Sequence, residues 1–175
     1  MCGIVGYTGK KSAQEIVIDS LKKLEYRGYD SSGIALHDGS ITFSKKEGPI
    51  ANLESVLKPS KSKMAIAHTR WATHGVPSDV NSHPHLSNDG KIAVVHNGTI
   101  DNYLDIKTVL EEEGFTFLSE SDTEVIPNLL SKYYDGDLVK ALSKVLEVIE
   151  GIFTIAAIHL DNAEEIVSVR NETPL

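Results

Sequence analysis

The 175-residue sequence contains a single cysteine, Cys2, so no disulfide can form within the chain. Basic residues are also few: 17 Lys and Arg stand against 25 Asp and Glu, a formal net charge of −8. This balance provides no basic stripe to offset phosphate charge, which argues against a nucleic-acid partner. No apolar run approaches the roughly 18 residues of a membrane span, and the N-terminus lacks the features of a signal peptide. We therefore expect a cytoplasmic protein with no membrane partner.

What is present is an ordinary globular composition, with 41% apolar and 24% charged residues. The length suits one domain, or one domain of a longer protein. Short apolar runs predict strands at 4–7, 33–37, 41–45, 64–68, 92–96, 115–118, 152–159 and 166–169. Apolar stripes at helical spacing predict helices over 13–24, 103–113, 125–133 and 138–149. Hairpin-like strand pairs with helices grouped between them favour an α+β fold, with helices packed on antiparallel sheets.

Local signals support several of these elements. Ser12–Glu15 and Ser121–Glu124 both have the spacing of a capping box, which predicts that helices begin there. Residues 76–91 are rich in Ser, Asn, Pro and Asp, and a loop of that length in a compact domain is usually functional or disordered. The strand at 92–96 is expected to end at Asn97-Gly98.

Cys2 is the first candidate for chemistry. An isolated cysteine is most often a small buried hydrophobe, but its position changes that expectation. Removal of Met1 is expected when a small residue follows, and it leaves a thiol and a free α-amine on one residue. The α-amine has a pKa of about 8 and the thiol a pKa of about 8.5, so the amine can accept the thiol proton and activate the nucleophile. Gly3 would leave room for a substrate beside the backbone.

Arg70 lies in the segment His68–Gly75, which combines polar groups, an aromatic residue and a glycine ahead of the long loop. An arginine at a strand end can present a planar fork to a carboxylate, and Thr73 can add a donor. The alternative is a surface arginine with core-facing neighbours. The composition of the segment favours the binding role.

Two further positions have both a structural and a functional interpretation. Asn97-Gly98 is either a two-residue hairpin turn or a pair of donors, an amide side chain and a backbone N–H, of the kind that forms an oxyanion hole. Asp122 either caps a helix, which the sequence alone favours, or binds a substrate ammonium. Together with the thiol and Arg70, these groups match the amide, carboxylate and ammonium of glutamine.

Several segments make the sequence similar to the class II glutamine amidotransferases. They are residues 2–6 (CGIVG), 24–31 (LEYRGYDS), 68–75 (HTRWATHG), 81–85 (NSHPH), 96–98 (HNG) and 119–124 (SESDTE). The blocks at 24–31 and 68–75 are the most specific, and in them the sequence most closely resembles the branch of the family that serves sugar phosphates. The resemblance implies an N-terminal-nucleophile hydrolase fold, a four-layer αββα sandwich of two antiparallel sheets.

The resemblance also implies roles for nine residues. Cys2 would be the nucleophile, with its own α-amine as general base, and Asn97 and Gly98 would form the oxyanion hole. The α-carboxylate of glutamine would be bound by Arg70 with Thr73 and His74, and the α-ammonium by Asp122. Arg27 would fix the nucleophile, and Trp71 would belong to a loop that closes over glutamine. The implied reaction hydrolyses the side-chain amide of L-glutamine through a cysteine thioester to glutamate and ammonia. It requires no metal and no cofactor.

In this branch the ammonia passes to a sugar-phosphate isomerase domain, which converts fructose 6-phosphate to glucosamine 6-phosphate. Residues 1–175 would form the glutaminase domain without its last strands, and the isomerase domain would be absent. Such a truncated sheet would expose an unpaired edge. The sequence is compatible with a homodimer and fixes no oligomeric state.

Three other functions remain open at this point. Five of the seven histidines lie within residues 68–96, which suggests a metal site, although no known zinc spacing is present. The chain could also be a catalytically inactive module that binds glutamine. Finally, a glutaminase domain could serve a different acceptor, as in purine synthesis.

Overall fold

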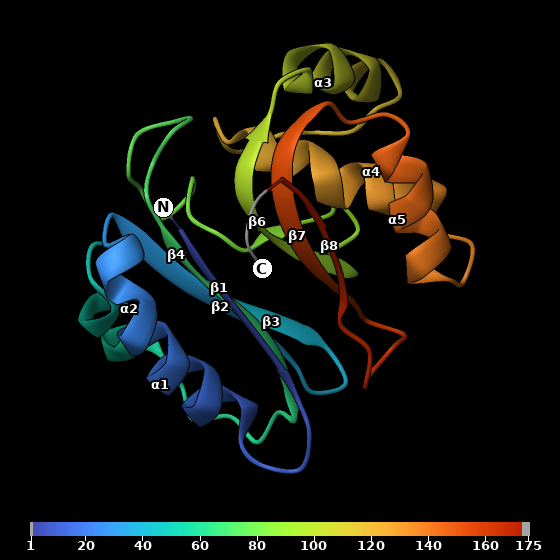
Figure 1. Cartoon of the computed structure of the whole chain (residues 1–175). Helices are drawn as coiled ribbons and strands as arrows, with labels where there is room; N and C mark the ends of the chain where they lie inside the picture. The colour runs from blue at the N-terminus through green and yellow to red at the C-terminus, as the bar shows by residue number, and fades with distance from the viewer. Residues whose placement is uncertain (1, 173–175) are drawn as a thin grey trace.

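The computed structural model describes residues 2–172, which form two four-stranded antiparallel sheets with helices on their outer faces (Figure 1). The strands are β1 (Gly3–Thr8), β2 (Ser31–His37), β3 (Ile41–Glu47), β4 (Met64–Arg70), β5 (His85–Leu86), β6 (Ile92–Ile100), β7 (Gly151–His159) and β8 (Val167–Asn171). The helices are α1 (Ala13–Leu24), α2 (Ile50–Val56), α3 (Tyr103–Glu112), α4 (Val125–Tyr133) and α5 (Leu138–Leu146), with 3-10 turns η1 (Glu25–Arg27) and η2 (Asp122–Glu124).

The strand order is β1-β4-β2-β3 in the first sheet and β5-β6-β7-β8 in the second. Helices α1 and α2 cover the outer face of the first sheet, and α4 and α5 cover the outer face of the second (Figure 1). The order of layers is therefore helix, sheet, sheet, helix. No helix within 2–172 is both long enough and apolar enough to span a bilayer.

The central strands are buried on both faces, which explains why their sequences are continuous apolar runs rather than alternating ones. In β2, Ile34 packs toward α1 and α2, whereas Ala35 faces the second sheet. The layer between the sheets combines Ile66 with small side chains, including Ala93 and Ala156. Small residues in this layer let the two sheets approach each other closely.

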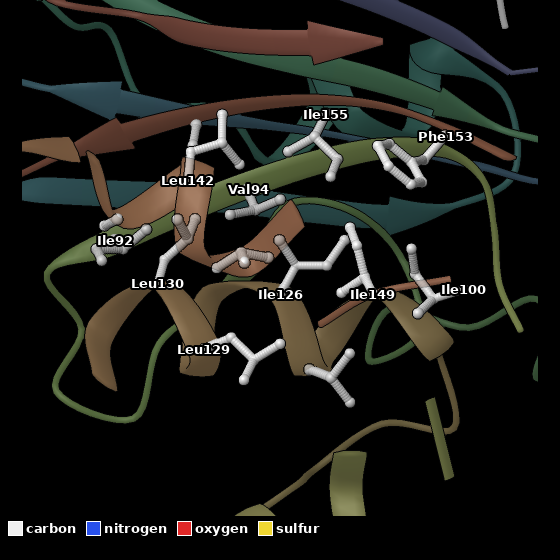
Figure 2. Close-up of a cluster of buried hydrophobic side chains, with 14 of the residues drawn as sticks. Ile92, Val94, Ile100, Ile126, Leu129, Leu130, Leu142, Ile149, Phe153 and Ile155 are labelled. Carbon is white, nitrogen blue, oxygen red and sulfur yellow. The ribbon is translucent and has the colours of Figure 1, made fainter. Parts of the chain in front are cut away.

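The largest core lies between the second sheet and its helices (Figure 2). Ile126 and Leu130 of α4 and Leu142 of α5 pack onto Val94 of β6 and Ile155 of β7, all nearly or fully buried. The predicted 3.6-residue stripes on α4 and α5 are therefore the faces that meet the sheet. This core fixes the second sheet against its helices and, with it, the position of β6.

Most predicted elements are present, and the serine of each predicted capping box accepts a backbone hydrogen bond, although Ser121 precedes the 3-10 turn η2 and binds the second residue after it rather than the third. Ser12 accepts a hydrogen bond from the backbone N–H of Glu15 (3.4 Å), and Ser121 accepts one from that of Thr123 (3.3 Å). Strand β6 does not end at Asn97-Gly98, however, because it stays paired with β7 as far as Ile100. The hairpin-turn interpretation of Asn97-Gly98 is therefore wrong.

Two other differences have identifiable causes. The predicted strand at 115–118 does not form, because its backbone donors bind side chains: Thr116 N–H donates to Asn88 (2.7 Å) and Leu118 N–H to Glu124 (2.9 Å). Helix α2 was not predicted, because its start lacks a local cap. The acceptor for its first N–H, at Ile50, is the carboxylate of Glu25 (2.8 Å), which is distant in sequence.

Gly33 in β2 is where the long loop meets the first sheet. A Cβ at this position would lie 2.0 Å from the backbone oxygen of His83, which cannot rotate away. We predict that Gly33→Ala lowers the free energy of unfolding by about 3 kcal/mol and the melting temperature by roughly 5–10 °C. In the control Gly6→Ala, on β1, the new methyl group would meet Ile166 at an ordinary 3.4 Å. Equal stability of the two variants in urea titrations would contradict this packing.

Candidate active site

A cavity of about 330 Å³ lies where the start of β1, the end of β4 and the middle of β6 meet. Eight of the nine predicted site residues line it: Cys2, Arg27, Arg70, Trp71, Thr73, Asn97, Gly98 and Asp122. The ninth, His74, contributes a backbone carbonyl to Arg70, and its ring packs edge-on against Tyr103 at 5.5 Å between centroids. Residues from five separate parts of the sequence thus converge on one site.

Cys2 is held by the end of β4. The backbone N–H of Gly3 donates to the Thr69 hydroxyl (3.1 Å), and that of Trp71 donates to the Cys2 sulfur (3.1 Å). Burial raises the pKa of the Cys2 thiol above its ordinary value, and the Trp71 N–H acts in the opposite direction because it stabilises the thiolate. Activation of this thiol therefore requires a nearby base.

Gly3 does not have the role that the sequence suggested. A Cβ on Gly3 would lie 2.8 Å from the Thr69 hydroxyl oxygen and 3.0 Å from the Cβ of Leu24. The missing side chain makes room for these neighbours rather than for a substrate. Met1, whose removal was expected, lies outside the described residues.

Arg70 is buried, and its guanidinium is only partly satisfied. Its Nη2 donates to the carbonyl oxygens of His74 and Gly75, the second at 3.3 Å, which ties it to the loop after β4. Its Nη1 is buried and has no hydrogen-bond partner within residues 2–172. Burial lowers the pKa of Arg70, and the neighbouring Asp122 and Asp30 oppose that shift. Arg70 thus lines the cavity as a buried cation with one donor nitrogen that has no partner among residues 2–172.

Asp122 is 4% exposed and does not act as the helix cap, since Ser121 takes that role. One carboxylate oxygen of Asp122 accepts the backbone N–H of Ile100 at 2.8 Å, which links η2 to the end of β6. Burial raises the pKa of Asp122, whereas the Ile100 N–H lowers it. A buried carboxylate of this kind is stabilised by a positively charged ligand.

Asn97 and Gly98 lie inside β6 at the cavity wall. The Asn97 side-chain nitrogen donates to the backbone oxygen of Cys2 (3.2 Å), so the second sheet contacts Cys2 directly. Gly98 has φ = 122°, and a Cβ there would lie 1.8 Å from the Ile152 oxygen of β7. Only glycine fits this position.

Sequence reasoning assigned no role to several residues that support the site. Asp30 accepts the backbone N–H of Ala72 (2.9 Å) and donates its own N–H to the Arg70 oxygen (3.1 Å), so it fixes the loop that carries Trp71 and Thr73. Its place in the 24–31 block was the only available signal. The blocks 68–75 and 119–124 likewise contain His68, Thr69 and Thr123, but their contacts could not be predicted because the partners are distant in sequence.

A group of four buried histidines lies behind Asn97: His68, His83, His85 and His96. The ring centroids of His68 and His83 are 4.1 Å apart, and the Thr123 hydroxyl lies 2.8 Å from a ring nitrogen of His83 and from one of His96. Burial lowers the pKa of His68 to about 4 and of His96 to about 3, so these rings are neutral near pH 7. Within 2–172, no three His, Cys, Asp or Glu side chains are arranged to hold a metal ion.

Comparison with protein-family models identifies the family to which the chain belongs. A family model described as a glutamine amidotransferase domain matches residues 68–175, more than half of the chain. The chain belongs to this family, and its two-sheet α+β architecture confirms the N-terminal-nucleophile hydrolase fold that the sequence resemblance implied.

Within this family, the chain is similar over its whole length to individual proteins of known name. Over its whole length the chain is 54% identical to the glutamine–fructose-6-phosphate aminotransferase (isomerizing) of Caldanaerobacter subterraneus subsp. tengcongensis and 53% identical to that of Clostridium perfringens. It spans 29% of the length of each of these relatives. Among solved structures, it is similar to the glutamine phosphoribosylpyrophosphate amidotransferase of B. subtilis, with a TM-score of 0.78 and 29% identity over 91% of this chain and 35% of that one.

The four buried histidines predict a loss of stability in mild acid. Their pKa values are lowered in the folded protein from about 6.5 when unfolded, so only the unfolded state takes up protons as the pH falls below about 6.5. The contribution of these histidines to the free energy of unfolding is therefore fully present above that pH, and it decreases as the pH falls toward their pKa values in the folded protein. We expect unfolding near pH 5 to take up roughly three to four protons, a slope of about 4–5 kcal/mol per pH unit.

Urea titrations between pH 7 and 5 measure this slope. The variant His85→Gln removes one buried histidine, so it should reduce the proton uptake by about one. A free energy of unfolding that stays constant over this range would contradict the predicted neutrality of the four rings.

Proposed function

We propose that this chain is a glutaminase that hydrolyses the side-chain amide of L-glutamine to glutamate and ammonia. The observation that carries the proposal is the convergence of Cys2, Asn97, Arg70 and Asp122 on one cavity. These residues supply a nucleophile, an oxyanion donor, a buried cation and a buried carboxylate. Glutamine carries the matching amide, α-carboxylate and α-ammonium.

In the proposed reaction, the Cys2 sulfur attacks the amide carbon while the α-amine of Cys2, freed by loss of Met1, takes up the thiol proton. A C–S bond forms, and the carbonyl π-electrons move to oxygen, where Asn97 and the backbone N–H of Gly98 donate to the oxyanion. Collapse of this intermediate breaks the C–N bond. The nitrogen leaves as ammonia with the proton returned by the α-amine, and a γ-glutamyl thioester remains.

Water completes the cycle. It attacks the thioester carbon, the α-amine accepts the water proton, and the same oxyanion donors act again. The C–S bond then breaks, the sulfur regains a proton and glutamate is released. The net reaction is glutamine plus water to glutamate plus ammonia, with no change of oxidation state.

The remaining site residues have roles in binding. Arg70 is proposed to hold the α-carboxylate through its unpartnered Nη1, with Thr73 and His74 beside it, and Asp122 to hold the α-ammonium. Trp71 has a half-exposed indole against Tyr29, at 5.8 Å between ring centroids, which suits a wall that moves over bound glutamine. Arg27 lines the cavity next to Cys2 and is proposed to fix the nucleophile.

We further propose that the ammonia aminates fructose 6-phosphate in a sugar-phosphate isomerase domain of the full-length protein, giving glucosamine 6-phosphate. The isomerizing aminotransferases support this acceptor, because the chain is 53–54% identical to two of them. Identity to the purine-pathway structures is 29–30%. The purine acceptor is therefore the less favoured alternative.

The first test is Cys2→Ala. Loss of the only sulfur nucleophile should reduce glutamate formation at least about 10³-fold, while glutamine binding stays measurable by calorimetry. Mass spectrometry of the wild-type chain establishes in parallel whether Met1 has been removed. Wild-type activity in Cys2→Ala would end the nucleophile assignment. A wild-type chain that lacks Met1, binds glutamine and never turns it over would establish the inactive binding module instead.

The second test is Arg70→Ala, which removes the proposed partner of the α-carboxylate. Charged hydrogen bonds contribute about 1.5–3 kcal/mol, so we expect the dissociation constant for glutamine to rise roughly 10- to 100-fold, with a smaller effect on kcat. Arg170→Ala on β8 is the matched control, since that arginine is exposed and lies outside the cavity. Loss of turnover with unchanged affinity would contradict the carboxylate role.

A further inference from the structure

The Asn97 side chain is held from both sides. Its nitrogen lies 3.2 Å from the backbone oxygen of Cys2, and its oxygen lies 2.8 Å from Nε2 of His68. A backbone oxygen can only accept a hydrogen bond, so the amide nitrogen must be the atom that faces Cys2. The amide oxygen then faces His68, and Nε2 of His68 must carry the hydrogen that it accepts.

The surroundings of His68 support this protonation state. His68 is fully buried, and burial lowers its pKa to about 4. The ring is thus neutral near pH 7, with one N–H, which the contact with Asn97 places on Nε2. His83 packs over the ring with 4.1 Å between centroids and is itself held by the hydroxyl of Thr123 at 2.8 Å. The donor is therefore fixed in direction.

The contact crosses from one sheet to the other. His68 belongs to β4, whose end also holds Cys2, and Asn97 belongs to β6. His68 does not line the cavity, so it does not touch a substrate there. An effect of His68 on the reaction would therefore have to pass through the Asn97 amide.

We propose that His68 is the positioning residue that keeps the NH2 group of Asn97 turned toward the reacting oxygen. This inference rests on the proposed glutaminase function, in which Asn97 donates to the oxyanion. One N–H of the amide is engaged by the Cys2 oxygen, and the second is available to the substrate. A flipped amide would instead present its oxygen lone pairs to the developing negative charge and destabilise it.

Variants at His68 test the proposal. His68→Leu removes the donor, and we expect kcat to fall about 10- to 100-fold, within the effect of losing one oxyanion donor, with KM changed less than about threefold. His68→Gln should restore most of kcat, because its side-chain NH2 reaches the position of Nε2. A purely structural role predicts no such rescue, and absence of rescue in a folded His68→Gln variant would overturn the proposal.

A double-mutant cycle isolates the route through Asn97. In the Asn97→Ala background, His68→Leu should lower kcat less than about twofold further, because there is no amide left to orient. Equal effects of His68→Leu in both backgrounds would overturn the proposal. His85→Leu is the matched control: it removes a buried histidine of the same cluster that makes no contact with Asn97, and kcat should stay within about twofold of wild type.

The wild-type protein provides a test that is independent of variant folding and of activity. Long-range ¹H–¹⁵N correlation spectra of ¹⁵N-histidine-labelled protein at pH 7 should show His68 as the neutral Nε2–H tautomer. An Nδ1–H tautomer or a protonated ring would overturn the positioning role. That result would leave the glutaminase proposal intact, whereas absence of glutamine turnover by the wild-type chain without Met1 would overturn the glutaminase proposal without changing the tautomer.

Discussion

The antiparallel pairing of β1 with β4 is the constraint on which the rest of the site depends. Its register places Gly3 opposite Thr69, so the residue before Gly3 lies beside the end of β4. The Trp71 N–H then reaches the Cys2 sulfur, and Arg70 enters the same cavity. A shift of one residue would exchange the two faces of β1. The glycine at position 3 permits this register, because a side chain there would clash with Thr69.

The space between the sheets changes character along the strands. In β4, Met64 and Ile66 belong to the apolar layer between the sheets, and the next alternate positions are His68 and Arg70. Because alternate residues share one face of a strand, the same face of β4 is part of the apolar core at one end and of the candidate site at the other. Small side chains in the apolar part let the sheets approach, so the amide of Asn97 on β6 can reach both Cys2 and His68. The core thereby sets the geometry of the polar end.

The sequence predicted the parts of the fold that have local causes. Apolar runs and capping residues such as Ser12 lie within a few positions of the elements they define, and those elements are present. Helix α2 was missed because Glu25 supplies the acceptor at its start, and the strand at 115–118 was wrong because Asn88 and Glu124 bind its backbone donors. No local pattern contains such long-range partners.

The residues of the candidate site also differ in whether the local sequence could identify them. The chemistry of the side chains and their sequence neighbours was enough to identify Cys2 and Arg70 as site residues. For Asn97 and Asp122, a structural role had equal or greater weight until the family resemblance assigned them to the same site. The structure removes one alternative for each: Asn97 lies within a paired strand, and Ser121 rather than Asp122 caps the helix. Supporting residues such as His68 act through contacts between the sheets, and the linear sequence holds no trace of those contacts.

Burial of opposite charges gives the cavity a basis for selectivity. Arg70 has lost solvent and retains an unused donor among residues 2–172, while burial raises the pKa of Asp122 and so disfavours its charged form. A ligand with both a carboxylate and an ammonium relieves both penalties at once. A ligand that lacks one of these groups leaves the other buried charge unpaired, a cost of about 1–3 kcal/mol or more. These two incompletely solvated groups therefore support the proposed binding of an α-amino acid.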